Sequence, residues 1–132
     1  MRLGVRNILL VAMLAWVARY ILLSFGGAEL HWPLYLAVLL HGICYDFFFV
    51  TGFIYSDLKA GEKIKSSAQG LFTIATYGIG MTFGSYLGGA VAKIFTENGV
   101  RNWSGLWLVP AAIAAVILVA FLFLFKEKQN KA

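Results

Sequence analysis

The stretch LHGICYDFFFVTGF (40–53) places a histidine, a tyrosine and an aspartate close together in one of the most apolar parts of the chain. His41 and Tyr45 are four residues apart and share one face of a helix, with Asp46 on the flank of that face. A carboxylate can take up and release a proton, while an imidazole and a phenol can hydrogen-bond to a polar ligand or stack on it. The three residues are therefore candidates for a binding site, with Asp46 as the group that exchanges protons.

The apolar surroundings of Asp46 favour a functional role. A charge at the centre of a bilayer costs from about 2.5 to well above roughly 10 kcal/mol, so such residues usually face a cavity. Structural alternatives stay open: Asp46 can cap a polar packing contact with Arg19 or another group of a neighbouring helix, and His41 and Tyr45 can simply fill space between helices. Cys44, the single cysteine, is predicted to be a buried packing residue.

The composition indicates that a membrane surrounds these residues. The 132 residues are 61% hydrophobic and 13% charged, with a mean hydropathy of +0.79, whereas soluble domains are roughly 45–50% apolar and about 25% charged. A helix needs about 20 mostly apolar residues to cross the hydrocarbon core. Four stretches qualify, at about 7–25, 33–55, 68–92 and 105–125. We therefore predict an all-α membrane protein, a single membrane domain (1–132) with four transmembrane helices in the lipid bilayer.

The basic residues predict how these helices are oriented. Lysine and arginine in short loops are retained on the cytoplasmic side. With the N-terminus inside, only Lys93 and Arg101 face outward and Arg19 lies within a span. The remaining basic residues are then cytoplasmic: Arg2, Arg6, Lys59, Lys63, Lys65, Lys126, Lys128 and Lys131. Both termini are therefore predicted to be cytoplasmic, and the net charge of +5 is explained by topology, with no nucleic acid partner.

The four spans differ in polarity. Spans 33–55 and 68–92 carry most polar side chains and are predicted to line an interior cavity, whereas 7–25 and 105–125 are predicted to face lipid. Within 68–92, Gly80, Gly84 and Gly88 recur every four residues, which predicts a surface for close packing of a neighbouring helix. Ser66 followed by Gln69 predicts a capping box at the start of this span.

Several kinds of catalytic site have no counterpart in the sequence. We find no Walker-type phosphate loop, no paired carboxylates, no cluster with metal-ligand spacing and no nucleophile elbow. The sequence therefore predicts a protein that is not an enzyme, with no cofactor and no metal.

Three stretches, LGVRNILLVAMLAWVARY, YDFFFVTGFIY and KIKSSAQGLFTIATYGIGMTFGS, resemble the C-terminal part of the nucleoside:proton symporter family of the major facilitator superfamily. The resemblance covers essentially the whole chain and implies the ninth to twelfth spans of a twelve-helix inner-membrane transporter, part of its C-terminal half. It implies that Asp46 is the acidic residue that contacts substrate and couples protons, and that Tyr45 packs near the nucleoside. His41 stands where family members have tyrosine.

The resemblance implies that the chain is the C-terminal portion of a proton-coupled nucleoside transporter, acting on nucleosides and protons. Four helices cannot form a two-sided cavity, so the chain is either a fragment or assembles with the missing N-terminal transmembrane helices, in the same or a separate chain. The alternative is a small four-helix membrane subunit that packs against other helices without transport. A small dimeric exporter would place its essential acid in the first span, where this chain has Arg19.

Overall fold

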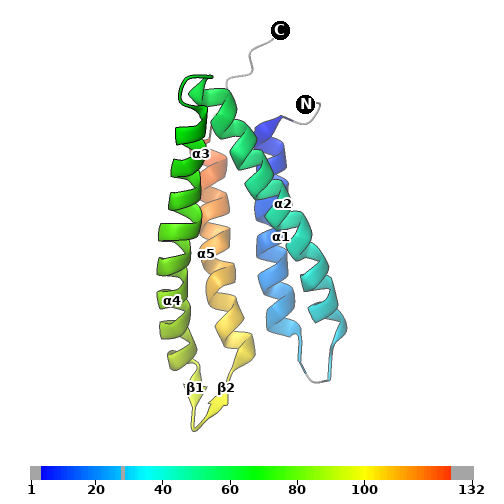
Figure 1. Cartoon of the computed structure of the whole chain (residues 1–132). Helices are drawn as coiled ribbons and strands as arrows, with labels where there is room; N and C mark the ends of the chain where they lie inside the picture. The colour runs from blue at the N-terminus through cyan, green and yellow to red at the C-terminus, as the bar shows by residue number, and fades with distance from the viewer. Residues whose placement is uncertain (1–3, 28, 126–132) are drawn as a thin grey trace.

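The computed structural model describes residues 4–27 and 29–125. The helices are α1 (Val5–Phe25), α2 (Trp32–Ala60), α3 (Lys65–Thr73), η1 (Ile74–Gly80), α4 (Met81–Ile94) and α5 (Trp103–Leu124). Helical backbone angles at both ends of η1, a π-helical segment, make α3, η1 and α4 one continuous column. The described chain therefore forms four helical columns, as predicted, arranged side by side in Figure 1.

Three of the described helices are long and apolar enough to cross a membrane: α1, α2 and α5. The prediction of an all-α membrane protein is confirmed. In the third column η1 separates α3 from α4, and each of these three segments is shorter than a membrane-spanning helix. The apolar stretch over 68–92, taken as a whole, is long enough for a span. A π-helical turn contains an extra residue, and such segments occur frequently at functional sites.

The core lies between α1 and α2 and continues from α1 to α5. Ala12 and Ala15 of α1 and Ala37 and Cys44 of α2 are all buried. Because these side chains are small, the two helix backbones can approach closely, and dispersion contacts replace the hydrophobic effect inside a membrane. The Cys44 thiol donates to the carbonyl of His41 at 3.3 Å, so the prediction that Cys44 is a packing residue is confirmed.

The third column contacts α2 through α3 and η1. α3 packs against α2, and the far end of α4 leads into a short hairpin of β1 (Thr96–Glu97) and β2 (Val100–Arg101). Between these ends α4 stands apart from α2, as Figure 1 shows. No described residue of α3, η1 or α4 is buried.

The hairpin was not predicted and follows from an Asn-Gly pair. Asn98 and Gly99 have φ angles of 49° and 79°, the left-handed values that a tight two-residue hairpin turn requires. The side chain of Asn102 then caps α5 by accepting the backbone N–H of Gly105 at 3.0 Å. Together the turn and the cap fix where α4 ends and α5 begins.

Candidate functional site

The predicted site residues lie along the middle of α2, on two different sides of the helix. The buried stripe of α2, which includes Ala37, Cys44 and Thr51, turns toward the core. Asp46 is two residues from Cys44, or about 200° around the helix, and it is exposed. His41 is also exposed, Tyr45 is half-buried, and their rings lie 5.7 Å apart. The structure thus brings His41 and Tyr45 together, while Asp46 points to the open side of α2.

An aromatic bridge joins α2 to the π-helical segment. The hydroxyl of Tyr45 is hydrogen-bonded to the hydroxyl of Tyr77 in η1. The Phe49 ring packs against both tyrosines, with centroid distances of 4.5 Å to Tyr45 and 5.2 Å to Tyr77. Tyr45 is therefore held by two contacts, and the polar edge of its ring is already paired. Sequence reasoning missed Tyr77 as a partner of Tyr45, because residues on different spans carry no sequence signal of contact.

The threonines of the third column are largely bonded to their own helix. Thr73, Thr76 and Thr82 donate to the carbonyls of Gln69, Phe72 and Gly78 at 2.9, 2.8 and 2.8 Å. A hydroxyl that bonds the carbonyl four residues earlier satisfies its own donor without a partner from another element. The sequence suggested that these polar residues line the wall of a cavity. Because their hydroxyls are bonded to their own helix, they do not by themselves create a polar wall.

A partly open cavity among the described residues differs from the predicted one. It has a volume of about 550 Å³ and is lined by residues of α1, α4 and α5, together with Phe48 of α2. His41, Tyr45 and Asp46 do not line it. α1 and α5 form most of this apolar wall, while other apolar side chains of both helices are exposed, so the prediction that spans 7–25 and 105–125 face lipid stays a prediction.

The glycine ridge opens onto the same cavity. Gly84 and Gly88 line it, and a methyl group added at either position would meet no atom within 4 Å. At Gly80 an added methyl group would lie 3.3 Å from the carbonyl oxygen of Ala75, in its own column. Within the described residues nothing packs against Gly84 or Gly88, so close helix packing at this ridge stays a prediction.

The predicted capping box at Ser66 and Gln69 is wrong. α3 begins at Lys65 without a side-chain cap. The Gln69 amide instead donates to Asp57 Oδ1 at 2.6 Å, and Lys65 Nζ lies 3.1 Å from Asp57 Oδ2. Asp57 near the end of α2 therefore ties α2 to the start of the third column, and the hydrogen bond from Gln69 is strong because its acceptor is an ionised carboxylate.

Among the described residues, no three His, Cys, Asp or Glu side chains gather closely enough to hold a metal ion. Arg19, the basic residue within α1, is half-buried, and its guanidinium lies 5.5 Å from the centroid of the Tyr20 ring. A cation above an aromatic face is stabilised by the ring quadrupole, so Arg19 has a partner on its own helix.

The helix arrangement closely matches a solved transporter structure. The crystal structure of nucleoside transporter NupG superposes with a TM-score of 0.87 and 30% sequence identity, over 95% of this chain and 32% of that chain. A structure of a NupG point mutant superposes with a TM-score of 0.89. These helices therefore have the arrangement of part of the major facilitator superfamily fold, the fold class of helical membrane proteins to which NupG belongs.

Sequence comparisons identify the family within that class. The sequence pattern described as "Nucleoside H+ symporter" matches residues 1–130. The putative nucleoside transporter YegT of Escherichia coli K12 is 37% identical over 139 residues, covering 98% of this chain and 33% of its own length. The nucleoside permease NupG of Escherichia coli K12 is 32% identical over 133 residues, covering 97% and 31%. The chain belongs to the nucleoside H+ symporter family and spans about a third of the length of these relatives.

Proposed function

We propose that this chain is the C-terminal portion of a proton-coupled nucleoside transporter of the inner membrane, with both termini cytoplasmic. In this proposal Asp46 takes up and releases the coupled proton, and Tyr45 and His41 contact the nucleoside. The family match supports nucleoside transport, and the site geometry supports these roles for the three residues.

The observation that carries the proposal is the position of Asp46. It is exposed halfway along α2, a helix apolar enough to span a membrane, on the side opposite the buried stripe. A carboxylate at this depth is costly against lipid, and intramembrane acids almost always face a bundle interior or a water-filled cavity. The open face of α2 is therefore the face that we assign to the transport pathway.

Tyr45 and His41 suit the ligand-binding role for different reasons. Tyr45 is held between Phe49 and Tyr77, so little of its freedom is lost when a flat base packs against its ring. His41 is exposed one turn earlier on the same face and offers a donor or acceptor to a polar group of the nucleoside. A bound nucleoside and a proton on Asp46 would then occupy neighbouring positions along α2.

The proposed pathway needs a second wall. The open face of α2 has no facing element among the described residues, and the chain spans only about a third of its relatives. In transporters of this superfamily the substrate lies near the midplane between two helical halves. We assign the missing wall to N-terminal transmembrane helices, supplied by the same polypeptide or by a separate one.

Uptake measurements test the role of Asp46. In the complete transporter Asp46→Asn keeps the shape of the side chain but cannot carry the proton, so proton-driven uptake of labelled uridine should be lost. Glu97→Gln, which removes an exposed carboxylate in the hairpin, is the matched control and should transport normally. Undiminished proton-driven uptake by Asp46→Asn, at equal amounts of protein in the membrane, would reject the coupling role of Asp46.

A further inference from the structure

The hydroxyl pair of Tyr45 in α2 and Tyr77 in η1 joins two helical columns at the proposed site. We propose that this pair acts as one hydrogen-bond donor to the nucleoside, so that Tyr77 is a substrate-binding residue together with Tyr45. The inference deepens the proposed function and rests on it, because it needs a nucleoside beside Tyr45. It gives the site a binding group from the third column.

The first argument is the number of hydrogens in the pair. Each phenol carries one O–H donor and oxygen lone pairs that accept. The bond between the two hydroxyls uses one of the two hydrogens, and the tyrosine that accepts it keeps its own. Within residues 4–27 and 29–125 neither hydroxyl has a second hydrogen-bond partner. One donor of the pair is therefore left without an acceptor in this part of the chain.

The depth of the pair decides what that donor needs. Tyr45 lies within α2, which is apolar enough to span a membrane. Burying a hydroxyl away from water without a hydrogen bond is unfavourable, and the hydrocarbon core offers no acceptor. The transport pathway supplies one, which is water when the site is empty and the nucleoside when it is filled. Nucleobases carry suitable acceptors on carbonyl oxygens and unprotonated ring nitrogens, so this bond becomes part of substrate recognition.

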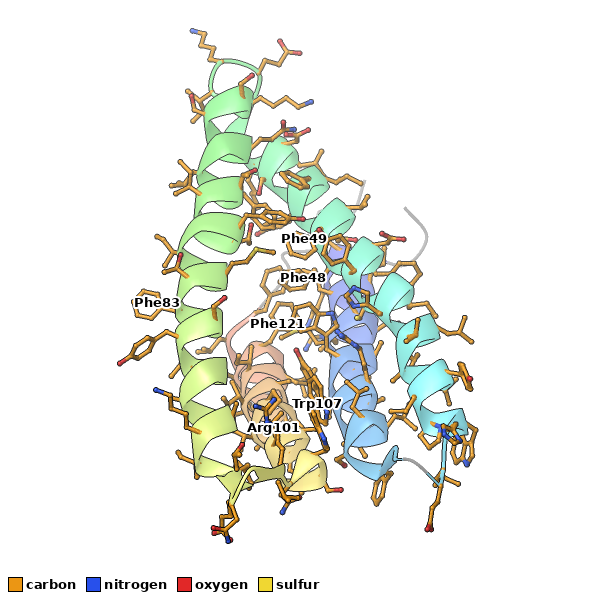
Figure 2. All side chains as sticks on the ribbon, turned by 60° about the horizontal axis from the view of Figure 1, so that its bottom comes forward. Phe48, Phe49, Phe83, Arg101, Trp107 and Phe121 are labelled. Carbon is orange, nitrogen blue, oxygen red and sulfur yellow. The ribbon has the colours of Figure 1, made fainter. Side chains whose placement is uncertain are left out.

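The second argument is that neighbouring aromatic rings hold the pair in place. Phe49 packs against Tyr45 and Tyr77 at centroid distances of 4.5 and 5.2 Å. Figure 2 shows Phe49 on the side of α2 that faces the third column. The ring of His41, also assigned to the nucleoside, lies 5.7 Å from that of Tyr45. A donor that is fixed in advance loses little freedom on binding, which favours affinity.

The third argument is that Tyr77 carries the hydroxyl of η1 that points away from its own helix. The other hydroxyl in this segment, that of Thr76, donates to the carbonyl of Phe72 at 2.8 Å. A threonine has a single O–H donor, so Thr76 has no hydrogen left for a ligand. Tyr77 lies in the middle of the π-helical segment, and such segments occur frequently at functional sites. Tyr77 is therefore the donor that η1 offers to the site on α2.

Transport kinetics of tyrosine variants test the proposal in the complete transporter, with labelled uridine as the probe. Tyr45→Phe and Tyr77→Phe each remove one hydroxyl and keep both rings, and the double variant has no hydroxyl left. Tyr86→Phe is the matched control, because it makes the same change on the third column at a side chain of α4 that is 79% exposed. The dissociation constant of uridine, measured by calorimetry on the purified transporter, separates binding from transport rate.

We expect the KM and the dissociation constant to rise about 3-fold in each single variant, the equivalent of an average interhelical hydrogen bond in membranes. The remaining hydroxyl still donates, but its partner no longer orients it. The double variant should rise further, to roughly 7- to 35-fold, since the neutral hydrogen bond to the nucleoside is lost as well. The maximum rate should stay near that of Tyr86→Phe, because a loss of uniform binding raises KM and leaves the rate unchanged.

Two results would overturn the proposal. One is a double variant with the dissociation constant of either single variant, which would mean that the nucleoside does not use the remaining hydrogen. The other is a lower maximum rate with an unchanged dissociation constant, which would mean that the pair only joins the two helices.

Tyr45→Ala separates this failure from a failure of the proposed function, because it removes the whole ring. A raised KM in Tyr45→Ala, together with a wild-type KM in the double phenylalanine variant, would keep Tyr45 in the site and reject the shared donor. Uptake at the wild-type KM in Tyr45→Ala would reject the site on α2 itself, and the donor with it.

Discussion

The crossing of α2 and α3 depends on Gly52, and replacing it with alanine gives a test with a predicted magnitude. A methyl group at Gly52 would lie 2.5 Å from Cζ and 3.0 Å from Cε2 of Phe72. The Phe72 ring cannot move aside freely, because it packs edge-on against Phe53 at 4.9 Å and Phe49 at 6.4 Å. Gly52→Ala must therefore displace either the aromatic cluster or the helix crossing.

The magnitude follows from two opposing terms. Overpacking a filled contact typically costs about 1–3 kcal/mol, whereas alanine in place of glycine inside a helix gains up to about 1 kcal/mol. Gly42→Ala on the same helix experiences only the second term, because its added methyl group meets nothing within 4 Å. The difference between the two variants isolates the clash, so Gly52→Ala should be less stable than Gly42→Ala by about 1–3 kcal/mol, or roughly 5- to 160-fold in the unfolding equilibrium.

The free energy of unfolding can be measured by titrating the transporter in bicelles with a denaturing detergent and following tryptophan fluorescence. Phe72→Leu shortens the ring that faces Gly52, so the double variant with Gly52→Ala should recover part of the loss. If Gly52→Ala unfolded at the same detergent fraction as Gly42→Ala, or if Phe72→Leu gave no recovery, the reasoning from this crossing would be refuted.

Two further predictions concern polar contacts that join the third column to α2. In a double-mutant cycle of Tyr45→Phe and Tyr77→Phe, we expect a coupling energy of about 0.6 kcal/mol and at most about 1.7 kcal/mol, the range measured for interhelical hydrogen bonds in membranes. A coupling energy of zero in the detergent titration would mean that the hydroxyl pair does not stabilise the contact between the two helices. Gln69→Ala should destabilise by about 1.5–3 kcal/mol, since its amide bonds the Asp57 carboxylate. Lys65→Ala should lower the free energy of unfolding by less than about 1 kcal/mol, since the Lys65 side chain is 52% exposed. Only the effect of Lys65→Ala should become smaller in high salt. Equal losses of stability in Gln69→Ala and Lys65→Ala would contradict this ranking.

The membrane spans were predictable because the thickness of the bilayer sets the length of each apolar stretch, and a hydropathy profile shows that length directly. The stretches 7–25 and 105–125 agree to within two residues with α1 and α5. α2 instead continues to Ala60, beyond the predicted end at 55, because the segment SDLKA keeps its helical hydrogen bonds after it leaves the apolar layer. Hydropathy marks where a helix can cross a membrane, and says little about where the helix stops.

Contacts between spans were much harder to predict than the spans themselves. Ser66 and Gln69 have the spacing of a local cap, yet Gln69 turns to Asp57 on another helix, because a carboxylate is available there. Tyr77 is one of several polar residues in its span, and only the fold shows that it meets Tyr45. The Asn98–Gly99 turn is different, since the dipeptide itself is a hairpin signal; the flanking strands are only two residues long, which is too short for an alternating pattern.

The orientation of Asp46 is determined by residues that lie on the other side of its helix. Ala37 and Cys44 belong to the buried stripe of α2, and α1, which packs against α2, has buried small residues of its own, including Ala12 and Ala15. The burial of this stripe against the core sets the rotation of α2 about its own axis. Asp46 faces away from α1 because it is about 200° from Cys44, and not because any group nearby attracts it. The exposure of Asp46 and the burial of the small residues of α2 therefore both follow from one rotation of that helix. The sequence encodes the direction in which Asp46 points mainly through the positions of alanine and cysteine along α2.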